Sequence, residues 1–249
     1  MVFLRRPICS YVVGKEPDRG TTKCYKFATI NIVETGKRFT LLALPVGSFD
    51  EKETILNKLL GYALQRIKIR RVYADRGFFD SKAINIFNRF NLKYLMPASK
   101  ISTVRDVMEI IPTPSVITDF KMKDITFNLV ILEEELKDGR KVKRAFATNE
   151  EYDENDVNLA ERLFDLYGKR WGVETSYRVK KHSYLAKTTS KNYLIRLFYF
   201  MLSVLLYNLW ILADILVWLA LFGMVKEDHL VTSKLFGTIL YTIDPDPGG

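Results

Sequence analysis

Cysteine and histidine are scarce in this 249-residue chain, which contains two of each. Two cysteines cannot build the disulfide framework of a small secreted protein, and Cys9 and Cys24 lack the spacing of a metal site. Beyond Arg5 and Arg6, the N-terminal segment also lacks the apolar run of a secretory signal peptide. These absences favour a protein of a reducing cytosol and disfavour a secreted one.

Acidic residues are also in deficit, because 38 lysines and arginines face 29 aspartates and glutamates, for a net charge of +9 and a pI near 9.4. This balance suits a polyanionic partner such as nucleic acid, although proteins without such a partner share it. Hydrophobic residues make up 48% of the chain, which is enough for a sizeable core in one domain, or in one domain with an insertion.

One long apolar run covers residues 193–225 and has two structural interpretations. By length it could span a bilayer. Arg196, Asn208 and Asp214 lie within it, however, and such side chains are costly in lipid unless they are paired or face protein. A buried helix or helical hairpin is therefore the alternative, and composition alone leaves both open.

The first part of the chain alternates between strand and helix patterns. Residues 21–46 predict two strands joined by a turn at Thr35-Gly36, and residues 51–67 carry apolar side chains at helical spacing. A short strand then ends at Asp75, and a helix at 80–90 and a strand at 92–98 follow. This order predicts an α/β fold, with a mixed sheet flanked by helices.

The second part breaks this alternation. Residues 118–149 predict a second hairpin around Lys137-Asp138-Gly139-Arg140, which we interpret as part of a β-rich insertion at about 112–150. From Asp153 onward the pattern is helical almost to the end, which gives an apolar C-terminal helical region.

Four residues at fixed spacing are the candidate functional residues of the helical region after Asp153. At about 100° per residue, Tyr167, Arg170, Glu174 and Lys181 fall within an arc of roughly 60° on one face of a single helix, and Arg178 lies just beyond its edge. Arg170 and Arg178 flank Glu174 at i−4 and i+4 and favour its ionised form. Spacing alone favours an ordinary solvated helix face with ion pairs over a functional site.

These residues resemble the signature of the cut-and-paste DNA transposases of the insertion-sequence-four group, which use an Asp-Asp-Glu metal site. The spacing Tyr-x2-Arg-x3-Glu-x6-Lys is intact in YGKRWGVETSYRVKK, and VYADRGF is similar to the strand that ends in the second catalytic aspartate of that family. The resemblance extends from about Gly20 to Asp214 and includes the β-rich insertion and the apolar helix, which in that family packs inside a soluble protein. It therefore favours the helix over the membrane span.

The resemblance implies a ribonuclease-H-like fold in which carboxylates hold two Mg²⁺ ions, for which Mn²⁺ can substitute. Asp75 and Glu174 would be catalytic residues and metal ligands, since hard cations prefer carboxylate oxygens. By the same similarity Arg170 and Lys181 would contact DNA phosphates, and Tyr167 would stack on or hydrogen-bond to the DNA backbone. We add Arg178 to the DNA-binding residues because of its position on the helix.

The first aspartate of the family has no clear counterpart. Residues 1–17 contain no aspartate, and Asp18 lies in Pro17-Asp18-Arg19-Gly20, whose composition indicates a turn. We therefore interpret the chain as truncated at its N-terminus, and expect it to be weakly active or inactive, because a two-metal site without its bridging carboxylate binds the ions poorly.

The expected organisation is a remnant segment at 1–20, a ribonuclease-H-like domain at 21–225 and a C-terminal tail at 226–249. The expected partners are double-stranded DNA at transposon ends and target, and a second copy of the chain, with no membrane. The expected location is the nucleoid in a prokaryotic cytoplasm. Two other functions stay open: a non-catalytic DNA-binding remnant, and a small membrane protein anchored through 193–225.

Overall fold

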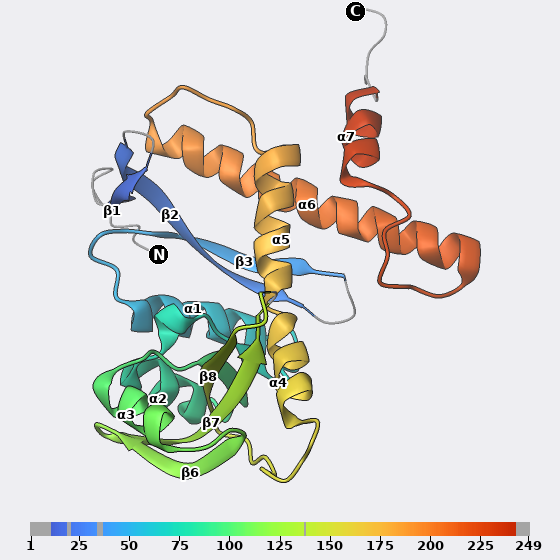
Figure 1. Ribbon diagram of the computed structural model, residues 1–249. Helices are drawn as coiled ribbons and strands as arrows, with labels where there is room; N and C mark the ends of the chain where they lie inside the picture. Colours follow the sequence, from blue (N-terminus) through green and yellow to red (C-terminus); the bar gives the residue numbers. More distant parts are fainter. Residues whose placement is uncertain (1–10, 19–20, 34–36, 137, 243–249) are drawn as a thin grey trace, which may run out of the picture. The chain divides into compact units, whose positions relative to one another are not determined.

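The computed structural model describes residues 11–18, 21–33, 37–136 and 138–242, and divides the chain into two compact units (Figure 1). The first unit is discontinuous and combines residues 1–50 with 171–249. The second is the continuous segment 51–170.

The first unit contains a three-stranded antiparallel sheet of order β1-β2-β3. β2 (Thr21–Ile32) and β3 (Phe39–Val46) pair from Ile32 opposite Phe39 to Lys26 opposite Val46, with one shift of register between Ile30 and Asn31, which confirms the hairpin predicted at 21–46. The predicted turn at residues 35–36 lies outside the described residues.

The sequence did not predict β1 (Val12–Asp18), which pairs with the opening residues of β2. Asp18 is the last residue of this strand and lies opposite Thr21, and residues 19–20 between them lie outside the described residues. The strand was missed because the Pro-Asp-Arg-Gly composition at its end masks the short β-branched run that begins at Val12.

The helices of the first unit are α5 (Trp171–Val179), the π-helix η3 (Lys180–Tyr184), α6 (Tyr193–Phe222) and α7 (Ser233–Thr242). α6 begins where the Asn192 side chain accepts a hydrogen bond from the amide of Leu194, at 2.9 Å. It ends at Gly223, whose φ of 66° is the left-handed conformation that glycine adopts without strain.

One face of α6 packs into the core of the first unit. Tyr184 of η3 and Tyr207, Trp210 and Ile211 of α6 form a buried cluster there, with Phe39 of β3 packed against it. α6 is the one helix in the described ranges that is long and apolar enough to cross a membrane, with a mean hydropathy of 2.1 over its most apolar stretch. Core helices of other proteins share these two properties.

Asp214 in the middle of α6 is completely buried and paired. Lys37 donates to its Oδ2 at 2.5 Å, the Nδ1 atom of His229 lies 2.8 Å from the same oxygen, and the amide of Val231 donates to Oδ1 at 2.8 Å. Burial would raise the pKa of Asp214, but the hydrogen bonds from Lys37, Val231 and His229 outweigh burial and hold the pKa below its usual value. The charge within the apolar helix is therefore neutralised by protein groups from outside that helix.

The second unit is built on a five-stranded mixed sheet of order β4-β5-β8-β7-β6. β4 (Val72–Tyr73) runs parallel to β5 (Tyr94–Pro97), and β8 (Lys141–Thr148) runs antiparallel to both β5 and β7 (Ile125–Glu135). β6 (Ser115–Met122) closes the far edge. The mixed α/β fold is thus confirmed, and the strands of 112–150 continue the sheet through β8.

Helices cover both faces of this sheet. α4 (Leu159–Gly168) packs Leu159 and Leu163 against Val130 and Leu132 of β7. Because successive strand residues point to opposite faces, the equally buried Leu129 and Ile131 point to the other face, which α2 (Ser81–Arg89) and α3 (Ser102–Ile110) contact.

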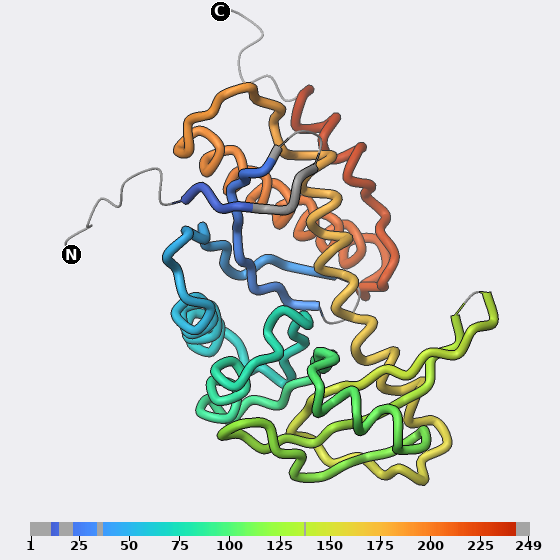
Figure 2. The backbone as a smooth tube through the Cα atoms, turned by 60° about the vertical axis from the view of Figure 1, so that its left-hand side comes forward, coloured from blue at the N-terminus to red at the C-terminus, as the bar shows by residue number. Residues whose placement is uncertain are grey.

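The predicted helices at 51–67 and 80–90 are confirmed as α1 (Lys52–Leu64) and α2, which contact each other. α2 begins where Asp80 accepts a hydrogen bond from the amide of Ala83, at 2.8 Å. The predicted β7–β8 hairpin is also confirmed, and the end of β7 and the start of β8 project beyond the rest of the second unit (Figure 2). α3 was not predicted.

Candidate active site

Asp75 is positioned by the short strand β4, in agreement with the predicted strand that ends at this residue. The amide of Val72 donates to the carbonyl of Lys93 at 2.8 Å, and the amide of Ala74 donates to the carbonyl of Leu95 at 3.2 Å. Asp75 is thus the first residue beyond the ladder, and its side chain is exposed. Its Oδ1 accepts a hydrogen bond from the amide of Arg76 at 2.8 Å, which starts the short 3₁₀ helix η2 (Arg76–Phe78).

A largely buried ion pair holds β4 in place. Arg71, directly before the strand, donates through Nη2 to Oε1 of Glu150 at 2.8 Å and through Nε to the other carboxylate oxygen. The ammonium group of Lys93 lies 3.2 Å from the same carboxylate. Burial would raise the pKa of Glu150, but the Arg71 and Lys93 charges lower it further than burial raises it. The strand that presents Asp75 is therefore tied to the end of β8.

Replacing Glu150 with alanine should destabilise the second unit, because the Arg71 side chain, only 18% exposed, would lose its counter-charge. We expect the free energy of unfolding to fall by about 2–3 kcal/mol, measured by urea denaturation. Since the pKa of Glu150 is lowered in the folded state, its stabilisation is present at neutral pH and is lost as the pH falls through that lowered pKa. Glu151→Ala, at an exposed neighbour, is the control, and an equal loss from both variants would contradict this role.

Tyr167 and Arg170 lie beside the strand that presents Asp75. The Tyr167 hydroxyl donates to the carbonyl of Ala74 at 3.3 Å, and its ring packs edge-on against Phe146 with the centroids 5.4 Å apart. Burial raises the pKa of Tyr167 to about 12, so the hydroxyl keeps its proton at neutral pH. The guanidinium carbon of Arg170 lies 5.3 Å from the centre of the Tyr167 ring. The structure thus brings together three of the six predicted site residues.

The other three, Glu174, Arg178 and Lys181, belong to the first unit, and the single helix predicted for the signature is wrong. α4 ends at Gly168, residues 169–170 form a turn in which the amide of Arg170 donates to the carbonyl of Tyr167, and α5 begins at Trp171. Gly168 explains the interruption, because glycine is a poor helix former. Tyr167 and Glu174 consequently lie on different helices.

Glu174 lies in the first turn of α5 and is exposed. The positive end of the helix dipole stabilises a carboxylate there, and Arg178 follows one turn later on the same side of the helix. The backbone of Gly172 is packed tightly against Arg38, since a Cβ atom at position 172 would lie 1.8 Å from the Arg38 Nε. Sequence reasoning did not place Arg38 beside α5, because only the fold brings residue 38 to this helix.

Lys181 lies in η3, where the helix widens and the amide of Leu185 donates to the carbonyl of Lys180 at 2.8 Å. Arg178, Lys181 and His182 are exposed at the edge of a cavity of about 330 Å³ that is also lined by Tyr177, Leu185 and Phe200. His182 had been assigned no role from the sequence. Arg178 and Lys181 thus bring two positive charges, with a histidine beside them, to the edge of this cavity.

Lys180 contributes a buried ammonium group to the same cavity, and its side chain is only 1% exposed. It donates to the Thr40 hydroxyl at 2.5 Å and to the Ser176 hydroxyl at 3.3 Å, and it lies 4.7 Å from the centre of the Tyr207 ring. No carboxylate lies within ion-pair distance of it in the described part of the chain. Burial lowers the pKa of Lys180 to about 8.

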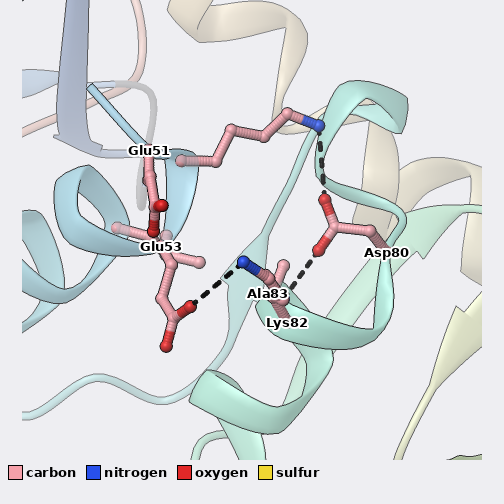
Figure 3. A pocket seen from close by; sticks show the side chains of 7 residues that line it. Glu51, Glu53, Asp80, Lys82 and Ala83 are labelled. Atoms are coloured by element: carbon pink, nitrogen blue, oxygen red, sulfur yellow. Dashed lines mark hydrogen bonds and ion pairs between the residues drawn. The ribbon is translucent and has the colours of Figure 1, made fainter. Parts of the chain in front are cut away.

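A smaller hollow of about 170 Å³ in the second unit is lined by Glu51, Glu53 and Asp80, of which Glu53 and Asp80 are engaged in ion pairs. The ammonium group of Lys52 lies 3.2 Å from the Asp80 carboxylate, and that of Lys82 lies 3.8 Å from the Glu53 carboxylate. Dashed lines mark the contacts of Asp80 and of Lys82 with Glu53 in Figure 3. These pairs connect α1 with α2 and leave the hollow without a free cluster of charge. Within the described ranges no group of three histidine, cysteine or acidic residues is placed to hold a metal ion.

Comparison with known proteins identifies one family over most of the chain. The family model described as "Transposase DDE domain" matches residues 22–209, about three quarters of the sequence. No curated protein matches.

Among solved structures, the fold is similar to a piggyBac transposase in a synaptic complex with hairpin DNA, with a TM-score of 0.67. The sequences are 14% identical, and the match covers 95% of this chain and 49% of that one. The chain thus spans about half the length of the solved transposase. At this identity the likeness concerns the fold.

Proposed function

Because the chain belongs to the transposase DDE domain family, we propose that it is a DNA transposase domain of the insertion-sequence-four group, with a ribonuclease-H-like fold. The observation that supports this proposal most directly is the set of signature side chains. Asp75 follows a sheet strand with Tyr167 and Arg170 beside it, while Glu174 lies in the first turn of a helix that also carries Arg178.

Asp75 and Glu174 would hold the divalent ions, Mg²⁺ or Mn²⁺. Both carboxylates are exposed, and carboxylate oxygen is the ligand that hard cations prefer, so the donor chemistry fits. When bound, the ions would activate the attacking oxygen and stabilise the leaving oxygen of a phosphodiester.

The other signature residues orient and attract the substrate. Tyr167 holds the carbonyl of Ala74 and thereby fixes the backbone next to Asp75. Arg170, Arg178 and Lys181 would neutralise DNA phosphates, and the net charge of +9 suits such a polyanionic partner. The proposed substrate is double-stranded DNA at the ends of an insertion sequence, and the proposed location is the nucleoid of a prokaryotic cell.

Metal binding and DNA binding should be separable by substitution. We expect Asp75→Ala and Glu174→Ala each to weaken Mn²⁺ binding by about tenfold or more, measured by calorimetry. Arg178→Ala with Lys181→Ala should instead weaken DNA binding and reduce the slope of log affinity against log salt by about 0.9 for each lost phosphate contact. Glu161→Ala, at an exposed residue of α4, is the control for metal binding.

The alternative function is DNA binding without catalysis. Incubation with Mn²⁺ and DNA that carries the ends of the element separates the two functions. Cleavage that is lost in Glu174→Ala supports the transposase. DNA binding with metal affinity that is independent of both carboxylates contradicts it and leaves the binding function.

A further inference from the structure

One side of the helix that carries Glu174 is buried against its own unit. Gly172 and Ser176 are the buried residues of α5, and Lys180, the first residue of η3, continues the same spacing of four. At about 100° per residue, Ser176 lies about 200° around the helix from Glu174. The buried side is therefore opposite Glu174, and the rotation at which this side docks sets the direction of the Glu174 carboxylate.

The buried side docks on the sheet through polar groups. The Lys180 ammonium group donates to the Thr40 hydroxyl of β3 at 2.5 Å and to the Ser176 hydroxyl at 3.3 Å. The Thr40 hydroxyl donates in turn to Oδ1 of Asn31 in β2, at 2.7 Å. Apolar contacts are not directional and tolerate a turn of the helix, whereas hydrogen bonds need a defined distance and angle. These contacts therefore favour one rotation of α5.

A second side chain of α5 reaches the same chain of hydrogen bonds. The Tyr177 hydroxyl is hydrogen-bonded to Oγ1 of Thr29 in β2 at 2.8 Å, and Thr29 also accepts from Nδ2 of Asn31 at 2.9 Å. Tyr177 and Lys180 are thus connected through Thr29, Asn31 and Thr40. Two anchors on two neighbouring strands define the rotation of the helix better than one anchor does.

Lys180 is a costly residue for this position. Its side chain is 1% exposed, and in the part of the chain that the structure describes no carboxylate lies close enough to neutralise it. Burial lowers the pKa of Lys180 to about 8, so folding disfavours the charged form. Buried polar groups that reduce stability can instead specify one packing arrangement. The helix also widens into a π-helix at this residue, and such turns are frequent at functional sites.

We propose that Lys180 is a positioning residue, which fixes the rotation of α5 through Thr40 and thereby aims the Glu174 carboxylate, and this assignment rests on the proposed role of Glu174 as a metal ligand. A lysine that only contributes to stability is the competing explanation. It predicts that metal binding weakens only in variants whose stability falls. A positioning residue predicts weaker metal binding even in a variant that is more stable.

Lys180→Met and Thr40→Val each remove one end of the hydrogen bond between η3 and β3. We expect both to weaken Mn²⁺ binding by about tenfold, measured by calorimetry, because groups that orient metal ligands have effects of this size. Lys180→Met should do so with a Tm above that of the wild type. Thr40→Ser keeps the hydroxyl and should bind Mn²⁺ as the wild type does. Lys187→Met, at an exposed lysine of the same unit, is the matched control.

The rotation of α5 can also be measured without metal. Nitroxide labels at Thr175→Cys in α5 and Lys26→Cys in β2 occupy exposed positions, in a chain whose two native cysteines are replaced by serine. Dipolar electron spin resonance then gives the distribution of distances between helix and sheet. We expect one narrow distribution for this labelled chain and for its Thr40→Ser variant, and a shifted or broadened one for Lys180→Met and Thr40→Val.

Label distances that are unchanged in both Lys180→Met and Thr40→Val overturn the positioning role. Mn²⁺ affinity that falls only in step with the Tm also overturns it, as does a Thr40→Ser variant that behaves like Thr40→Val. If Mn²⁺ binding by the wild type does not depend on Glu174, the proposed function fails instead. The label distances then decide by themselves whether Lys180 positions α5.

Discussion

Asp214→Ala is expected to lower the free energy of unfolding of the first unit by about 3–5 kcal/mol, because it leaves the Lys37 ammonium buried without its counter-charge. The loss should be visible in urea denaturation followed by tryptophan fluorescence, since Trp210 and Trp218 both hydrogen-bond to the segment that carries His229. The same substitution removes the acceptor of the Val231 amide and so releases this segment from α6.

The double variant Lys37→Met/Asp214→Leu tests the effect of removing both members of the ion pair. Replacing both members of a buried ion pair with apolar groups is often neutral, so the double variant should be more stable than Asp214→Ala. The pKa of Asp214 is lowered in the folded state, so its stabilisation is present above the unfolded pKa of about 3.9 and is lost as the pH falls through the folded value. A loss from Asp214→Ala that is the same at every pH would contradict an electrostatic origin.

Lys180→Met is expected to change stability in the opposite direction. A pKa of about 8 against an unfolded value of about 10.5 means that the folded state disfavours the charged lysine by about 3 kcal/mol at pH 7. Methionine fills a similar volume without a charge, and Thr40 and Ser176 keep the hydrogen bonds to Asn31 and Val173. We therefore expect Lys180→Met to be more stable at neutral pH and to have a higher Tm.

The pH dependence of stability shows whether the gain from Lys180→Met comes from removing a buried charge or from better packing. Between pH 8 and 10.5 the unfolded chain binds more protons at Lys180 than the folded chain does, so the wild type gains stability as the pH rises. The advantage of Lys180→Met should therefore shrink over that range in parallel melts. Lys181→Met, at the exposed neighbour, should show neither effect. A pH-independent gain would identify packing as the cause.

Local sequence patterns correctly predicted the hairpins, helices and strands that depend mainly on neighbouring residues. The β2–β3 and β7–β8 hairpins, α2 and β5 follow from alternation, turn residues and helical spacing, and all were predicted. The strand end at Asp75 was also predicted, from a β-branched run followed by a turn pair. The family signature was recognisable because its gaps are fixed in the sequence.

The features that the sequence did not predict depend mainly on contacts between residues far apart in the chain. Nothing in the pair Lys180-Lys181 indicates that one lysine is buried and the other exposed, because the hydroxyl from Thr40 and the Tyr207 ring come from distant elements. The ion pair between Arg71 and Glu150 joins residues that are 79 positions apart in the sequence. The break at residues 169–170 was missed because the periodicity of apolar and charged residues continues through it.

The discontinuity of the first unit has a consequence for synthesis. Its opening strands are separated from α5 and α6 by the roughly 120 residues of the second unit. At about 5–20 residues per second, these strands leave the ribosome some 6–24 s before the helices that will cover them. During that interval the second unit can complete its sheet, since all five of its strands lie within its own segment. The order of translation therefore allows the segment 51–170 to fold before the two segments that flank it in the sequence can combine.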